Sequence, residues 1–162
     1  MIIDFDLDFL GDAAALIDAG LERLDREANA SPDPVEFGVF DQVEYIAGFG
    51  FVACQTYATA VVSRRKLDKG AALALGPKHR AGRSIAQLVN AAANHWKHSS
   101  EWPRDAPTSR AMQTIEVIQS LGVDANGSYP LANSLYEILR PLPARFANLI
   151  PFLIQWRDAL TK

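Results

Sequence analysis

The sequence predicts an all-α protein: a single domain over residues 1–162, built as a bundle of five or six helices with an extended N-terminal arm. Three observations lead to this fold class. Apolar residues recur at helical spacing in several segments, proline and glycine clusters separate these segments, and a single short stretch alternates with the period of a strand. With 49% apolar and 22% charged residues, the chain has a globular composition and enough apolar surface for one core.

The first ten residues, MIIDFDLDFL, are predicted to form the extended arm over 1–10. Apolar residues from Ile3 to Phe9 alternate strictly with three aspartates, as on a strand with one apolar face. Side chains on one face of a strand lie roughly 6.8 Å apart, so the three carboxylates are poorly spaced for one metal ion. The stretch also lacks the basic region that begins a signal peptide. We therefore expect an arm that packs its apolar face on the body and binds no metal.

Residues 35–63 form the most apolar segment and are predicted to be a central helix. Eighteen consecutive residues in it carry no charge, which approaches the length of a membrane span, but Gln55, two glycines and several hydroxyl groups favour a buried helix without membrane contact. Gly50, Cys54 and Ala58 follow one another at four-residue spacing, so another helix of this chain or of a second copy could approach closely. The alternative is a β-hairpin, because each glycine in AGFGFV lowers helix propensity by about 1 kcal/mol relative to alanine.

The remaining helices follow from apolar periodicity and from start and stop signals. Asp12 can cap the first of them. They are predicted at 12–29, 82–99, 109–121, 130–139 and in a C-terminal segment that ends near residue 160. Pro151 must either kink this last helix or stand in its first turn, with a separate short turn before it.

The charges are distributed very unevenly along the chain. Residues 1–44 hold twelve acids and two bases, whereas residues 64–83 hold seven bases and one acid, although the net charge is −3. We interpret residues 64–82 as a basic connecting segment. It is expected either to pair with the acidic N-terminal region or to contact a polyanion such as a nucleic acid.

The helix predicted at 82–99 has one apolar side and one polar row. At about 100° per residue, six polar side chains fall within about 80° of arc. They are Arg83, Gln87, Asn90, Asn94, His98 and Glu101. Solvent-facing helices favour lysine and glutamate, whereas the middle of this row holds amides and an imidazole, which both donate and accept hydrogen bonds. The row is typical of a polar seam between packed helices or of a groove for a polar ligand or RNA; a plain solvent-exposed face is the third interpretation.

Two further residues complete the candidate binding site. His95 lies at the border between the two sides of the helix, and Lys97 adds a charge beside the row. His95 and His98 are three residues apart and could share a metal ion with Glu101, but His95 and Glu101 lie about 120° apart on one helix, so no metal site is predicted. The predicted binding residues are Arg83, Asn90, Asn94, His95, Lys97, His98 and Glu101, with His98 as the candidate catalytic residue.

The stretch from Ala93 to His98, ANHWKH, resembles the signature of the HEPN domains found in bacterial defence and toxin–antitoxin systems. That signature is an arginine, a polar residue, three variable residues and a histidine, late in a long helix. Asn94 and His98 match it, and Ala93 stands where the arginine belongs. The resemblance implies a helical bundle that dimerises with the motif at the dimer interface. Active members cut RNA without a metal, the histidine moving a proton and the arginine clamping the phosphate. Alanine cannot clamp, so we expect a member that does not cleave.

The leading hypothesis is a homodimeric binding module related to HEPN domains, which binds RNA, a nucleotide or a protein partner and uses no cofactor. The single cysteine, Cys54, excludes an intramolecular disulfide and fits a reducing compartment, so we expect a cytoplasmic protein. The second hypothesis is a structural or protein–protein interaction domain without a ligand. The third is a metal-independent RNase that recruits its cation from elsewhere.

Overall fold

The computed structural model describes residues 4–103, 105 and 107–160, and its fold is all-α, as predicted. Within these residues there are seven α-helices and two short 3-10 helices, more than the five or six expected. The α-helices are α1 (Phe5–Ala30), α2 (Val39–Arg64), α3 (Lys69–Leu73), α4 (Ile85–His98), α5 (Ser109–Gln119), α6 (Pro130–Leu139) and α7 (Ile150–Ala159). The 3-10 helices are η1 (Ser99–Glu101) and η2 (Phe146–Asn148). The part of the chain described here holds no strand, only an isolated bridge between Lys78 and Ser84.

The predicted N-terminal arm is wrong, because residues 5–10 form the first turns of α1. Asp4 caps this helix: its carboxylate accepts a hydrogen bond from the backbone N–H of Leu7 at 3.2 Å. Asp6 and Asp8 in the first turn interact favourably with the positive end of the helix dipole. Asp12, the predicted cap, lies exposed inside the helix. Residues 1–3 of the predicted arm lie outside the described part of the chain.

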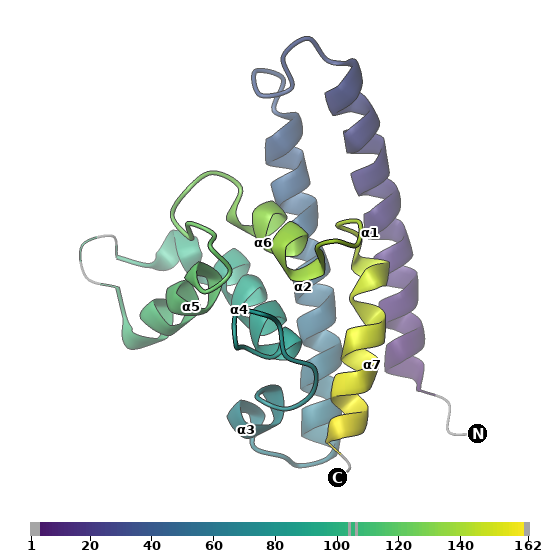
Figure 1. Ribbon diagram of the computed structural model, residues 1–162, viewed down its shortest axis with the longest axis vertical. Helices are drawn as coiled ribbons and strands as arrows, with labels where there is room; N and C mark the ends of the chain where they lie inside the picture. Colours follow the sequence, from purple (N-terminus) through teal and green to yellow (C-terminus); the bar gives the residue numbers. More distant parts are fainter. Residues whose placement is uncertain (1–3, 104, 106, 161–162) are drawn as a thin grey trace.

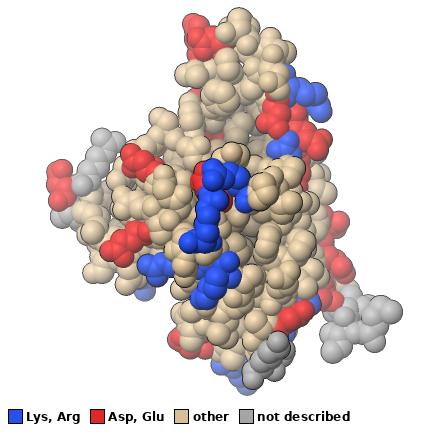
Figure 2. Space-filling model, in the orientation of Figure 1, with Lys and Arg blue, Asp and Glu red and all other residues tan. Residues whose placement is uncertain are grey.

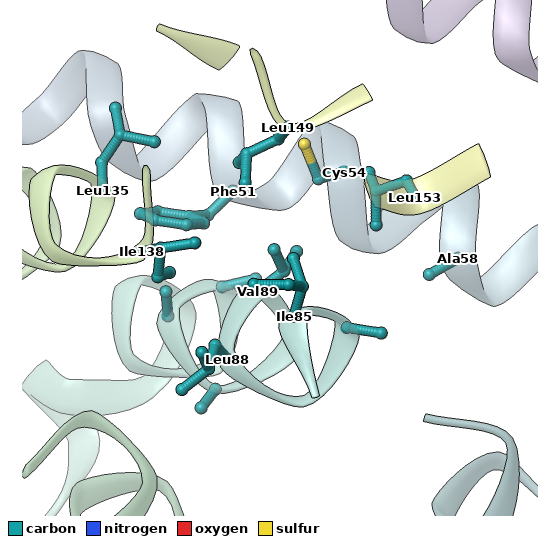
Figure 3. Close-up of a cluster of buried hydrophobic side chains, with 14 of the residues drawn as sticks. Phe51, Cys54, Ala58, Ile85, Leu88, Val89, Leu135, Ile138, Leu149 and Leu153 are labelled. Atoms are coloured by element: carbon teal, nitrogen blue, oxygen red, sulfur yellow. The ribbon is translucent and has the colours of Figure 1, made fainter. Parts of the chain in front are cut away.

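Helix α2 is the central helix, and the β-hairpin alternative is wrong. Its glycines are placed where large rings come close: a Cβ at Gly48 would lie 2.3 Å from the ring of Trp96, and one at Gly50 would lie 2.2 Å from that of Phe146. Cys54 and Ala58 are buried in the same core (Figure 3). The row of small residues is therefore filled by side chains of this chain.

By length and composition, α2 is the one helix in the described residues that could cross a membrane, and 56% of its most apolar window is buried inside the protein. It pairs along its length with α1, forming a long helical hairpin that Figure 1 shows at the right and back of the molecule. Helices α4 and α6 pack against α2 of this hairpin, and α5 packs on the far side of α4 (Figure 1). Buried side chains from α2, α4, α6 and α7 meet in one core, among them Phe51, Val89, Ile138 and Leu153 (Figure 3).

The boundaries of the later helices agree closely with the predicted ones. Helix α4 is shorter than predicted at its start, because Ser84 and Gln87 form a capping box there. Helix α6 has the predicted bounds. Pro151 stands in the first turn of α7 with η2 before it, so the second of the two predicted arrangements is confirmed.

The basic connecting segment contains the short helix α3, which was not predicted. Asp68 caps it by accepting a hydrogen bond from the N–H of Ala71 at 2.8 Å. The indole Nε1 of the fully buried Trp156 donates to the carbonyl of Ala72 at 2.9 Å, which fixes α3 on α7. The basic connecting segment is therefore anchored in the core through α3.

Most of the described acids in the N-terminal region do not form ion pairs with the basic connecting segment. Among the described residues, Arg64 is the member of that segment that forms an ion pair with them, with Asp6. Two half-buried or buried acids cap helices instead. Glu44 accepts hydrogen bonds from two backbone N–H groups at the start of α6, and Asp18 accepts two at the start of η2. Acidic side chains that face solvent gather along the edge formed by α1 in Figure 2.

Candidate ligand groove on helix α4

Helix α4 is fixed on its apolar side and open on its polar side. Ala86, Val89 and Ala93 are fully or almost fully buried, and Ala93 packs so closely that none of its surface is exposed. Gly48 on α2 admits the ring of Trp96, so α2 and α4 approach closely at the end of α4. The polar row therefore lies on a helix whose rotation about its own axis is set by packing.

A groove of about 980 Å³ runs along the polar row of α4, between α3 and α5. All six residues of the predicted row line it: Arg83, Gln87, Asn90, Asn94, His98 and Glu101. Lys69 contributes from the start of α3, Arg110 from α5, and Trp102 from the loop after η1. Four of the six lie on α4, from Gln87 to His98, as the wheel places them, whereas Arg83 precedes the helix and Glu101 lies in η1.

A buried glutamine, Gln55, fixes the two asparagines that line the groove. The amide of Gln55 is 6% exposed, and its Nε2 donates to the Oδ1 atoms of Asn90 at 2.9 Å and Asn94 at 2.8 Å. Its Oε1 accepts a hydrogen bond from the ammonium of Lys97 at 2.7 Å. This arrangement is a polar seam between α2 and α4, and it also fixes three side chains at the edge of the groove.

The seam determines which atoms of the asparagines remain for a ligand. Because both Oδ1 atoms accept from Gln55, the Nδ2 groups of Asn90 and Asn94 are left as donors, and no partner for them occurs among the described residues. Two amides that could present either polarity are thus oriented as donors. Such a pair suits an acceptor such as a phosphate, a carboxylate or a base carbonyl.

Positive charges gather around the groove without acidic partners. Lys69, Arg83 and Arg110 line it; Lys97, a predicted binding residue, does not line it, and its ammonium donates to Gln55. No ion pair joins these four to any carboxylate in the described part of the chain. Burial and the nearby charge of Lys97 lower the pKa of Lys69, whose ammonium donates to Thr59 at 3.3 Å. Two acids also line the groove: Glu101, 3.4 Å from the imidazole of His98, and Glu116.

Two predicted residues have different surroundings from those expected. His95 does not line the groove: it is buried, and its Nε2 lies 2.8 Å from the carbonyl of Ala125, to which it donates. Burial lowers the pKa of His95. Its ring packs edge-to-face on Trp102. His98 is half-exposed at the groove, and no group of three metal-ligating side chains occurs in the residues that the structure describes.

Gln55 was not predicted as part of the site. Its signal was present, since it is the one amide side chain in the uncharged stretch over residues 45–62 of hydrophobic, small and hydroxyl-bearing residues. What the sequence could not supply is the register of α2 against α4, which brings it within reach of Asn90, Asn94 and Lys97.

Comparisons with known proteins found no matching family model, no matching curated protein and no matching solved structure.

Proposed function

We propose that the chain is a binding protein, related to HEPN domains, that holds single-stranded RNA in the α4 groove through its phosphates and base edges and does not cleave it. A single nucleotide is the smallest ligand of this kind. The observation that carries the proposal is that the whole polar row, which includes Arg83, lines one groove together with two further cationic residues, Lys69 and Arg110, and with Trp102.

The chemistry of the groove matches that of a single strand. Phosphates need cations and N–H donors, which Lys69, Arg83, Arg110 and the two oriented asparagine amides supply. Unpaired bases stack on aromatic side chains, and Trp102 lines the same groove. A double-stranded helix, in contrast, would present a convex backbone that needs a wide basic surface.

The absence of cleavage follows from position 93. The motif resemblance calls for an arginine there, and Ala93 is fully buried in the core. An arginine at this position would have to displace packed side chains before it could reach a phosphate. His98 can transfer a proton, but position 93 supplies no guanidinium to clamp the phosphate. The clamp is the larger contribution to stabilising the negative charge that develops in the transition state.

A second candidate function has its own supporting observation. Gln55, Asn90, Asn94 and Lys97 form a connected hydrogen-bond network between two core helices. Such a network can serve to align α2 and α4 alone, in a structural or protein-interaction domain without a ligand. In that case, the cations around the groove would have no bearing on binding.

Binding of a labelled short single-stranded RNA, followed by fluorescence anisotropy over a salt series, separates the two. If the three cations that line the groove contact phosphates, the slope of log K against log salt should be about −2, and Arg83→Ser with Arg110→Ser should reduce its magnitude by about 1.4, at about 0.7 per phosphate contact. Arg26→Ser, an exposed arginine on α1 away from the groove, is the matched control and should leave the slope unchanged. Equal effects of both changes, or no saturable binding, would refute the proposal.

Cleavage is tested on the same RNA by denaturing gel in the presence of EDTA. We expect intact RNA after prolonged incubation at high protein concentration. Cleavage that disappears in a His98→Ala variant would instead establish the metal-independent RNase and overturn the non-cleaving assignment.

A further inference from the structure

Helix α1 carries an apolar stripe that faces solvent. Phe5, Phe9 and Leu16 are between 65% and 78% exposed, and they lie within about 40° of arc on the helix. Single exposed apolar residues are ordinary on protein surfaces, but three large ones in one line are not.

Helix α2 continues this surface beside α1. Its solvent-facing residues include Tyr45 and Phe49, which are about 60% exposed and pack edge-to-face against Trp96 of α4. A hollow of about 350 Å³ joins the two helices, and its lining is mostly apolar. Phe9 and Ala13 line it from α1, and Ala53, Thr56 and Ala60 line it from α2. We call this combined surface the hairpin face.

The hairpin face is large enough for a stable interface. Its five large side chains are on average about two thirds exposed, so at about 200 Å² each they offer on the order of 600 Å² of apolar surface. Small alanines and the threonine between them add further area. A standard interface buries about 800 Å² on each partner, and exposed apolar patches of this size mark interaction sites.

We propose that a second copy of the chain covers the hairpin face, so that the protein forms a two-fold symmetric dimer. The charges at the edges of the face favour this occupant. The acidic edge is formed by Asp8 and Asp12, which are exposed on the side of α1 that points away from α2. The basic edge lies on the other side of the hairpin face, where the ammonium groups of Lys69 and Lys97 donate hydrogen bonds to side chains of α2. A two-fold axis parallel to α2 places the acidic edge of each copy against the basic edge of the other.

The same edges disfavour an anionic membrane as the occupant, because the aspartates flank the apolar stripe. The proposed interface also differs from the one that the HEPN resemblance implies, since the hairpin face consists of α1 and α2 and does not contain His98. The inference rests on the exposed apolar residues of α1 and α2, which do not line the groove, and not on the proposed function; Lys69, which lines the groove, and Lys97 beside it are shared between the two sites.

Sedimentation equilibrium of the full chain tests the proposal. We expect a dimer at micromolar concentration, and Phe9→Lys with Leu16→Lys should weaken dimerisation at least a hundredfold. Both side chains are more than 70% exposed, so the fold should survive, which circular dichroism checks. The matched control is Phe37→Lys, which alters an equally exposed aromatic residue in the turn between α1 and α2, outside the hairpin face, and should leave the dimer intact.

A second substitution tests the choice of partner. Asp12→Lys reverses the charge of the acidic edge and should weaken dimerisation about tenfold, because it then faces Lys97 and Lys69 of the other copy. A wild-type chain that stays monomeric at high micromolar concentration would overturn the proposal. So would a dimer that resists the double substitution in α1, or one that Asp12→Lys leaves unchanged.

Discussion

Two substitutions of Gln55 should separate the structural role of the polar seam from its role in orienting the groove. Gln55→Leu removes three side-chain hydrogen bonds of 2.7 to 2.9 Å. At about 0.5–1.5 kcal/mol net for each bond, and with partly exposed partners that water can reach, we expect a loss of about 2 kcal/mol in the free energy of unfolding. The asparagine Nδ2 donors remain, so RNA affinity should change less than about threefold.

Gln55→Glu should give the opposite result. A carboxylate accepts a hydrogen bond from Lys97, and it has no donor for Asn90 and Asn94, so both amides must turn their Nδ2 groups towards it. The network is satisfied again, and stability at pH 8 should stay within about 1 kcal/mol of the wild type. The groove then presents two acceptors in place of two donors, and RNA affinity should fall at least tenfold, or about 1.4 kcal/mol.

The added negative charge needs a control of its own. Gln87→Glu adds the same charge to the lining of the groove, and glutamate retains the capping box with Ser84, so the asparagine amides are untouched. It should weaken RNA binding less than Gln55→Glu does. Urea unfolding gives the stabilities and anisotropy gives the affinities. Equal losses of affinity in the two glutamate variants would show that amide orientation does not matter, and the reasoning would be refuted.

Three other predictions concern the core. Gly50→Ala should destabilise the fold by about 1–3 kcal/mol, because its Cβ would lie 2.2 Å from the ring of Phe146, whereas Gly11→Ala, with nothing within 4 Å, should be neutral or stabilising by up to about 1 kcal/mol; urea unfolding compares them. Burial lowers the pKa of His95 in the folded state, so the folded state resists protonation. Stability should be retained above about pH 6.5, the unfolded pKa, and should fall as pH decreases below it; a His95→Gln variant should lose this dependence in unfolding measured from pH 7.5 to 5. Burial raises the pKa of Cys54 to about 12, so its thiol should react with Ellman's reagent at pH 8 only at the rate of unfolding, and rapid labelling of the folded protein would contradict its place in the core.

The part of the polar row from Gln87 to His98 could be predicted because it depends on one helix alone. Once the segment is helical and Val89 and its neighbours are buried, the angle between residues fixes which side chains share the opposite face. The groove itself could not be predicted in this way. Its other walls come from α3 and α5, and the contributions of Lys69 and Arg110 depend on how loops of the chain return to α4.

The N-terminal arm shows where the pattern of apolar residues was insufficient. A strict alternation over seven residues fits a strand, but Phe5 and Phe9 are also four residues apart and lie on one side of a helix, while Leu10 begins the buried side. Aspartate is a poor strand former and a good helix cap, and Asp4, Asp6 and Asp8 all stand where a helix start favours acids. The identity of the alternating polar residue therefore carried more information than the period.

The seam and the groove, which were predicted as alternatives, depend on the same four side chains. A buried amide can satisfy two asparagine oxygens only if their nitrogens turn away from it, and on α4 the direction away from α2 is the groove. Lys97 is held in the same way, with its ammonium on Gln55 at the groove's border. Alignment of the two core helices thus orients the donors at no additional cost in side-chain entropy, since the side chains are already fixed in the absence of ligand. A structural seam without a ligand explains the hydrogen bonds, but it leaves Arg83 and Arg110 in the groove with no ion pair to any carboxylate among the described residues, and an anionic ligand accounts for both.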